Sequence, residues 1–357
     1  RKQPLILFIT FAVIVAFSLF YTPSPIYGYN KVIRFGFIGV TMFLTPIIFI
    51  RTQNDSKILL NYFKYSILII LFAIIGQFLY FAISGKFAFL LGYYNRFSIP
   101  GANPIQVSRY LAIGATIMTV YIIRRSVFYN ISHFLILLAL LLAIIATGSR
   151  GPLVSIFFGI ICYAYLFEKQ HKKRIYLYGS FAIIIAFSLL IILPEIITKR
   201  FFDVSQGAVL LTPEGVKHVS TVATRLGYWQ MSIESWFSSL WNNFLGLGAG
   251  GFSSLFIWRD WRWYPHNVFF EVLVEYGSIG LIVFISFLII SYKKISEGLV
   301  EGIFTDHSAV WVAVTLVMFF SAQFSGDIND NRVLWMLIGI TIASTHVDQD
   351  KNIEVVP

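Results

Sequence analysis

The chain has 357 residues, of which 57% are hydrophobic and only 12% are charged. A soluble domain of this length would need about twice that share of charged residues to cover its surface, so the composition indicates an integral membrane protein. The formal net charge of +10 does not indicate nucleic-acid binding, because the basic residues form short clusters between apolar runs, where they anchor helix ends. The single cysteine, Cys162, excludes an internal disulfide and a cysteine-based metal site.

Apolar runs long enough to cross ~30 Å of hydrocarbon recur along the whole chain, which favours helices over the short alternating segments of a β-barrel. We predict an all-α polytopic membrane protein, a bundle of about ten transmembrane helices with one long loop. Arg1–Phe20 shows no cleavable signal pattern, and because the first residue is not methionine, the sequence allows for further residues or a helix before Arg1. The predicted spans are residues 4–20, 32–50, 65–83, 104–123, 131–147, 152–167, 175–193, 266–290, 308–324 and 332–346.

The basic residues of the short loops predict the orientation of the bundle, because such residues gather on the cytoplasmic side. The opposite, outer side then receives the long segment 194–265, in which we expect amphipathic helical segments. This division gives seven helices in residues 1–193, the outer loop 194–265, three helices in residues 266–346 and a cytoplasmic tail, 347–357. The basic clusters that define the cytoplasmic side are Arg1 and Lys2, Arg51 and Lys57, Arg124 and Arg125, Lys169 to Arg174, and Lys293 and Lys294.

The run GLGAGG, Gly246–Gly251, fits the spacing of a dinucleotide-binding fingerprint. That fingerprint requires a preceding strand and a βαβ unit, and here the run lies on the predicted outer face among membrane helices. We therefore interpret it as a close-packed turn that uses the torsional freedom of glycine.

The stretch WRWYPHNVFFEVLVEYGSIG, Trp261–Gly280, carries a histidine and two carboxylates into an apolar span. At the helical rise of about 1.5 Å per residue, Glu275 would lie ~13 Å below His266, inside the bilayer. A carboxylate there is costly unless it faces a wet cavity, is protonated or pairs with a cation, for which Arg109 is a candidate. Glu271 also fits a first-turn acid favoured by the helix dipole. The spacing predicts a polar stripe on one helix face: His266, Asn267, Glu271, Glu275 and Ser278.

Two arginines on the predicted outer side, Arg150 in a tight turn and Arg225 in the long loop, run against the orientation rule. A turn arginine can simply extend to the lipid headgroups, and a loop arginine can be solvated. Two guanidinium groups and an imidazole on one face nevertheless suit a reaction on a phosphorylated lipid. Guanidinium binds phosphate oxygens through paired hydrogen bonds, and imidazole can take up a proton near neutral pH.

Metal binding has little support, because the sequence contains no His-Glu-x-x-His or similar ligand spacing. The segment Asp327–Asp330 fits either a cation site or, as we favour, a solvated turn that caps a helix. Four aromatic residues before His266 fit an interfacial belt and could equally stack on sugar rings: Trp258, Trp261, Trp263 and Tyr264.

Three stretches resemble motifs of the bacterial O-antigen ligase and O-antigen polymerase superfamily. TGSRGPL resembles its Ser-Arg-Gly turn, with the arginine at Arg150, and TRLGYWQMSIESWFSSLWNNFLGLGAGGF resembles its Arg-x3-Trp stretch, with the arginine at Arg225. The stretches occur in the family's order and span about residues 147–280, whereas the first 140 residues resemble the family mainly in hydropathy. HNVFFEVLVEYGSIG is similar to its His-[Asn/Ser/Gln]-x9-Gly-x-x-[Gly/Thr/Tyr] pattern, with these residues in place: His266, Asn267, Gly277 and Gly280.

The resemblance implies a metal-independent, usually inverting glycosyltransferase that needs no cofactor and lies in the bacterial inner membrane with its active site on the periplasmic face. Its donor would be an oligosaccharide linked to undecaprenyl diphosphate. Polymerases of the superfamily join repeat units of O-antigen, capsule or exopolysaccharide, whereas ligases transfer a finished glycan to the lipid A core; flippases and chain-length regulators are expected partners. The strict ligase motif Arg-x3-Leu is absent, since Arg225 is followed by Tyr228 and Trp229, which favours a polymerase.

In this hypothesis Arg150 and Arg225 stabilise the charge that grows on the departing diphosphate, and His266 accepts the proton of the acceptor hydroxyl. A flippase or other transporter of lipid-linked oligosaccharide would also need basic residues and a polar cavity, and a scaffold for polysaccharide assembly is a third interpretation. The ionisable residues gather at one face beside a long loop, which favours the enzyme. Further substrate contacts are predicted at Asn267, Glu271, Arg109, Trp263 and Tyr264, although Asn267 also fits a structural role.

Overall fold

The computed structural model divides the chain into two compact units. The first unit comprises Arg1–Asp55, Val204–Phe304 and Ala322–Pro357, and the second comprises Ser56–Asp203 and Thr305–Ser321. The structure describes residues 2–85, 99, 101–125, 131–168, 208–212, 215–219, 221–256, 260–301 and 305–346.

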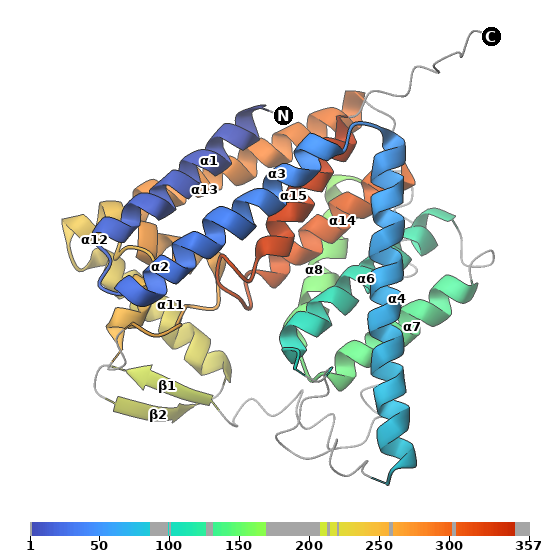
Figure 1. The fold of residues 1–357 in the computed structure, drawn as a ribbon, viewed down its shortest axis with the longest axis horizontal. Helices are drawn as coiled ribbons and strands as arrows, with labels where there is room; N and C mark the ends of the chain where they lie inside the picture. Colours follow the sequence, from blue (N-terminus) through green and yellow to red (C-terminus); the bar gives the residue numbers. More distant parts are fainter. Residues whose placement is uncertain are drawn as a thin grey trace. The chain divides into compact units, whose positions relative to one another are not determined.

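The first unit packs helices from both ends of the chain against each other (Figure 1). Helix α15 lies against α3, and α1 lies against α13. Aromatic rings fill the space between them, since Phe8 contacts Phe43 at 4.3 Å and Phe287 at 5.0 Å between ring centroids. The elements are α1 (Lys2–Phe17), η1 (Ser18–Phe20), α2 (Pro25–Arg34), η2 (Phe35–Gly39), α3 (Val40–Phe49), β1 (Ala208–Thr212), β2 (Gly215–Val219), α11 (Thr221–Phe237), α12 (Leu240–Leu245), η4 (Gly251–Leu255), α13 (Val268–Glu301) and α15 (Arg332–Thr345).

The second unit is a smaller bundle in which α14 lies against both α6 and α8. The contact with α8 is close because Gly159 has no side chain: a Cβ there would lie 2.7 Å from the Cα of Val317. Arg124 joins two other parts of this unit through ion pairs to Glu168 at 2.6 Å and Asp306 at 2.8 Å. Its elements are α4 (Gln53–Ile83, apart from its first residues), α6 (Pro104–Arg125), α7 (Ile131–Ala146), α8 (Arg150–Leu166) and α14 (Asp306–Ser321).

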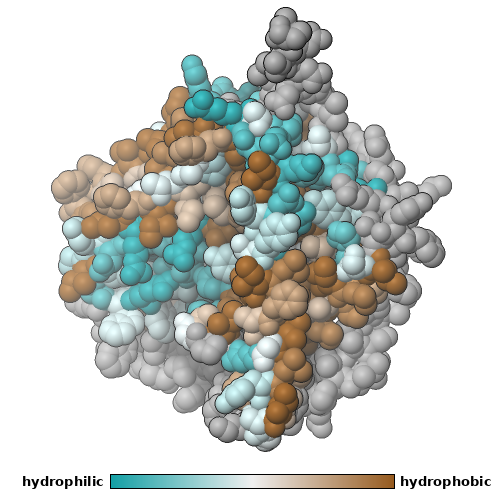
Figure 2. Space-filling view, turned by 45° about the vertical axis from the view of Figure 1, so that its right-hand side comes forward, coloured by the Kyte–Doolittle hydropathy of each residue, from teal (hydrophilic) through white to brown (hydrophobic). Residues whose placement is uncertain are grey.

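The helices confirm a multi-pass membrane protein. Five of them are long and apolar enough to cross a membrane, and four shorter apolar helices accompany these in the described part of the chain. Hydrophobic side chains also cover wide areas of the surface (Figure 2), and Phe72 and Ile83 on α4 are 68% and 86% exposed. The predicted seventh span, residues 175–193, lies outside the described residues, so the total of about ten helices remains a prediction.

The long loop contains one element that the sequence analysis did not predict. β1 and β2 form an antiparallel pair in which Ala208 lies opposite Val219 and Thr212 lies opposite Gly215. The bundle is therefore helical with one small hairpin, and not purely all-α. The helical part of the loop agrees with expectation, since α11 and α12 cover most of the aromatic, serine-rich stretch.

Helix α13 is broken at Gly277, where φ is 62° and ψ is −165°. The break leaves the carbonyl groups of Val274 and Glu275 without their usual helical donors, and an unbonded carbonyl is costly in a membrane interior. The glycine-rich turn supplies the donors: Leu247 N donates to Val274 O at 2.9 Å and Gly248 N to Glu275 O at 2.8 Å. This confirms the interpretation of the GLGAGG run as a close-packed turn.

Both sides of this contact require glycine. A Cβ at Gly277 would lie 2.4 Å from the carbonyl oxygen of Phe244, and a Cβ at Gly246 would lie 2.5 Å from the carbonyl carbon of Glu275. Gly246 also has a φ of 73°, which L side chains rarely adopt. The two backbones can touch only because neither residue has a side chain.

The substitution Gly277→Ala should lower the free energy of unfolding by more than about 2 kcal/mol, because it adds backbone strain to a clash with the Phe244 backbone. Thermal unfolding in detergent micelles measures the change. Gly36→Ala is the matched control, since a Cβ there meets no atom within 4 Å. Equal melting temperatures for the two variants would show that the break does not need glycine.

Candidate functional site

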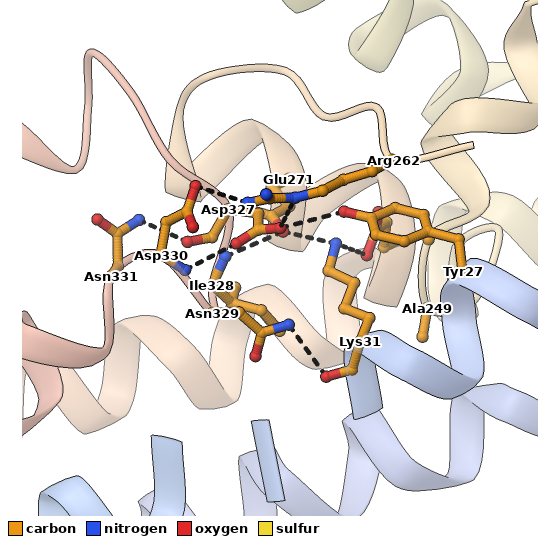
Figure 3. Close-up of polar contacts among 12 residues, drawn as sticks. Tyr27, Lys31, Ala249, Arg262, Glu271, Asp327, Ile328, Asn329, Asp330 and Asn331 are labelled. Atoms are coloured by element: carbon orange, nitrogen blue, oxygen red, sulfur yellow. Dashed lines mark hydrogen bonds and ion pairs between the residues drawn. The ribbon is translucent and has the colours of Figure 1, made fainter. Parts of the chain in front are cut away.

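The first unit buries one lysine between two glutamates (Figure 3). The Lys31 Nζ lies 2.6 Å from Glu271 Oε1 and 2.5 Å from Glu275 Oε2, and all three side chains are inaccessible to solvent. Glu271 and Glu275 are four residues apart on α13, so one helical turn presents both carboxylates to a single ammonium group from α2. Removing one partner of such a buried ion pair leaves an uncompensated charge and is strongly destabilising.

The partner of Glu275 in the structure is Lys31, whereas the sequence analysis predicted Arg109. The prediction missed Lys31 because it started the second span at residue 32 and left Lys31 in the preceding loop. In the structure α2 begins at Pro25, nearly two turns earlier. The sequence carried a signal for this start, since serine followed by proline is typical of the first positions of a helix.

Asp327 extends the buried network toward the surface. Its carboxylate accepts hydrogen bonds from the Tyr27 hydroxyl at 3.1 Å and from the backbone N–H of Asp330 at 2.7 Å. Arg262 approaches Asp327 at 3.4 Å and pairs with Asp330 at 2.8 Å. Asp327 is only 1% exposed, so the prediction of a solvated turn is wrong for this residue. The turn is held instead by ion pairs to Arg262, a half-exposed residue that lies far away in the sequence.

The same turn is hydrogen-bonded to Glu271 and to the backbone of Lys31. The backbone N–H of Ile328 donates to Glu271 Oε1 at 3.1 Å, and Asn329 Nδ2 donates to the Lys31 carbonyl at 3.1 Å. Glu271 therefore anchors Lys31 and the turn, and its predicted contact with substrate remains a prediction. Within the described residues, no group of three His, Cys, Asp or Glu side chains is arranged to hold a metal ion.

His266 lies at the entrance of α13 in a strained backbone conformation. Its φ is 61°, which is uncommon for a residue with a side chain and is found most often at functional sites. The residue that follows fixes the helix start: Asn267 Oδ1 accepts from the N–H of Phe269 at 2.9 Å, and Asn267 Nδ2 donates to the Gln323 carbonyl at 3.3 Å. Asn267 is thus a helix cap, which supports its structural role over a substrate contact.

The helix that follows the hairpin, α11, positions His266. The Trp229 indole donates to the carbonyl of Pro265 at 3.1 Å, directly before the histidine. The Tyr228 ring stacks on the His266 ring, with centroids 6.3 Å apart and planes inclined by 18°. Tyr264 also contacts the imidazole, edge to face, with ring centroids 4.5 Å apart. The residues three and four positions after Arg225 therefore hold both the backbone and the ring of His266.

Burial and a neighbouring positive charge keep His266 uncharged. Burial, and then the Arg225 guanidinium, lower the pKa of His266 from 6.5 to about 4, against a smaller opposing effect of Asp327. Its Nδ1 atom is buried and has no hydrogen-bond partner in the described part of the chain. The ring is therefore a neutral base at physiological pH, with one nitrogen unused. Arg225 is half-buried near it, so two of the three predicted catalytic residues come together.

The remaining predicted site residues have different placements. Arg150 is the half-buried first residue of α8, and Arg109 is 2% exposed on α6; both belong to the second unit, and their roles in the site remain predictions. Trp263 packs on Tyr228, with centroids 6.1 Å apart, so at least part of this side chain serves the core. Trp261 is 69% exposed, as expected of an interfacial residue, and Trp258 lies outside the described residues.

Replacing Lys31 by methionine should lower the free energy of unfolding by about 3–5 kcal/mol, because two buried carboxylates lose their only close cation in the described structure. Chemical or thermal unfolding in detergent measures this loss. Lys293→Met, at an exposed lysine of α13, is the matched control. The triple variant Lys31→Met, Glu271→Gln, Glu275→Gln should recover part of the loss. If Lys31→Met alone melts like the control, the ion pairs do not support the fold.

A comparison with protein families bears on this arrangement. Residues 135–285 match a family model described as O-antigen ligase. The match contains all three motifs, including Arg150, Arg225 and His266. No curated protein matches the sequence.

Proposed function

We propose that this chain, whose residues 135–285 match the O-antigen ligase family model, is a membrane glycosyltransferase of the O-antigen ligase and polymerase superfamily and joins polysaccharide repeat units at the periplasmic face of the inner membrane. The donor is an oligosaccharide on undecaprenyl diphosphate, and the acceptor is a sugar hydroxyl. The observation that carries the proposal is His266: an uncharged imidazole with an unused nitrogen, held in a strained conformation beside Arg225.

The reaction requires a base and a cationic leaving-group site. The acceptor oxygen attacks the anomeric carbon, the bond from that carbon to the diphosphate oxygen breaks, and the electron pair leaves with the diphosphate. The proton of the acceptor hydroxyl goes to His266. Arg225, and Arg150 by prediction, stabilise the negative charge on the diphosphate, and a single displacement inverts the anomeric centre.

The residues around His266 fit the changes in charge that this reaction requires. Before the donor binds, the positive charge of Arg225 disfavours protonation of the His266 ring, which therefore stays neutral. A bound diphosphate neutralises the arginine and attracts positive charge, so the imidazolium becomes stable only when the donor is in place. Tyr228 and Trp229 contribute by fixing the ring and the backbone of His266.

The variants His266→Gln and Arg225→Gln test the proposal. With purified protein and a synthetic lipid-diphosphate donor, His266→Gln should lower kcat by about 10²–10⁴-fold, and Arg225→Gln by about 10²–10³-fold. Arg150→Gln tests the predicted second arginine in the same assay. Arg51→Gln, at an exposed arginine, should keep the wild-type rate. A wild-type rate in His266→Gln would remove this ring from the chemistry.

The pH profile should separate the free enzyme from the donor complex. Because His266 acts as a base and its pKa in the free protein is about 4, kcat/KM should show no loss due to this group between about pH 5.5 and 8. The bound diphosphate raises the pKa of the ring, so the acidic limb of kcat should lie at higher pH than that of kcat/KM. Initial rates at saturating and at low donor concentration give the two profiles. Coincident limbs would contradict the predicted contact between donor and ring.

Because the matching family model is described as O-antigen ligase, ligase activity is a second candidate. The products made from one defined repeat unit, with and without lipid A core, distinguish the two. A ladder of glycan lengths without core supports the polymerase, whereas transfer only to core supports the ligase. Either product formed in detergent, without sealed vesicles, excludes a flippase as the sole function.

A further inference from the structure

The first unit contains a cavity of about 290 Å³ that the proposed reaction does not use. It lies between α2 and the segments around Arg262 and Asp327, and its lining includes one face of α2. That face repeats every four residues, as a helix surface requires, through Ile26, Asn30 and Arg34 of α2, and Ile38 continues it in η2. Trp261 and Arg332 complete the outer part of the lining.

Each of the three acidic residues of the lining has a partner within the protein. Asp260 accepts the backbone N–H groups of Ile26 at 2.9 Å and Tyr27 at 2.7 Å, at the start of α2. The other two, Asp327 and Asp330, share Arg262. The carboxylates are therefore committed to the protein itself and do not need a bound cation.

Two arginines of the lining remain without such a partner. Arg34 and Arg332 are exposed, and neither forms an ion pair with any carboxylate in the described part of the chain. Arg34 lies nine residues after Pro25, ~13 Å along an apolar stretch that is long enough to cross a membrane. An arginine at that depth is costly unless it reaches water or meets an anion.

The apolar members of the lining indicate where the anion comes from. Ile26 is 70% exposed and Trp261 is 69% exposed, so the cavity opens beside hydrophobic surface. Exposed tryptophan is typical of the membrane–water boundary, where lipid phosphates lie. Guanidinium groups bind phosphate oxygens through paired, charge-assisted hydrogen bonds.

We propose that this cavity binds the phosphate headgroup of an anionic bilayer lipid, with Arg34 and Arg332 as its ligands and the acyl chains along the face that Ile26 of α2 and Ile38 of η2 share. Phosphatidylglycerol is the probe for this site. The site is separate in its residues from His266 and Arg225, and binding requires no glycan transfer.

The test measures lipid binding to the purified full chain by native mass spectrometry and by the shift in melting temperature. Phosphatidylglycerol should bind and raise the melting temperature, whereas phosphatidylcholine and inorganic phosphate should not. The variant Arg34→Gln, Arg332→Gln should weaken phosphatidylglycerol binding by at least about tenfold, since two charge-assisted hydrogen bonds are lost. The variant Arg34→Lys, Arg332→Lys should retain most of it, and Arg51→Gln should retain all of it.

The controls separate the possible failures. Equal binding of phosphatidylglycerol and phosphatidylcholine, or undiminished binding by Arg34→Gln, Arg332→Gln, would overturn the proposal. Stabilisation by inorganic phosphate alone would show a site for free anions and would also overturn it. A melting temperature without lipid that matches the wild type shows that the double variant is folded. If it does not match, the lysine variant decides, because loss of binding there contradicts a site that rests on charge.

Discussion

Lys31 brings a positive charge to a place in the first unit where its side chain is inaccessible to solvent. Two carboxylates of α13, Glu271 and Glu275, surround it at 2.6 and 2.5 Å. Neither the lysine nor the glutamates could remain charged in this interior alone, so α2 and α13 must be adjacent for either to be tolerated. The turn at Asp327 is fastened to the same cluster through Ile328 and Tyr27. The entrance of α13, where His266 lies, is thus built on these charges.

The break in α13 also depends on groups that a distant segment of the chain supplies. Gly277 interrupts the helix two residues after Glu275, and the freed carbonyls are satisfied by the glycine-rich turn. Ser18 also binds this turn, because its hydroxyl oxygen accepts the N–H of Ala249 at 3.0 Å. A polar backbone inside an apolar bundle is acceptable only when other chain segments supply every missing hydrogen bond. The turn and the broken helix therefore depend on each other.

The Arg-x3-Trp stretch gains a physical meaning from these contacts. Arg225 supplies charge, while Tyr228 and Trp229 hold His266 by stacking and by one hydrogen bond. Because Tyr228 and Trp229 lie three and four positions after Arg225 on α11, a single helix sets both the electrostatics and the geometry of the imidazole. The strain at His266 is sustained by the rigid segments on either side, the capped helix start and the Pro265 anchor.

The sequence by itself determined the membrane class and nine of the predicted spans, which correspond to helices in the described residues, because hydropathy and length are local properties. It also singled out His266 and Arg225 as candidate site residues, because their motifs are short and contiguous, and their catalytic roles remain predictions. Tertiary structure alone decided that Lys31 faces Glu271 and Glu275, since 240 residues separate Lys31 from Glu271 (271 − 31) and no periodic pattern encodes such a pairing. Tertiary structure also decided the break at Gly277 and the burial of Asp327, because each depends on hydrogen-bond donors or cations that distant segments supply.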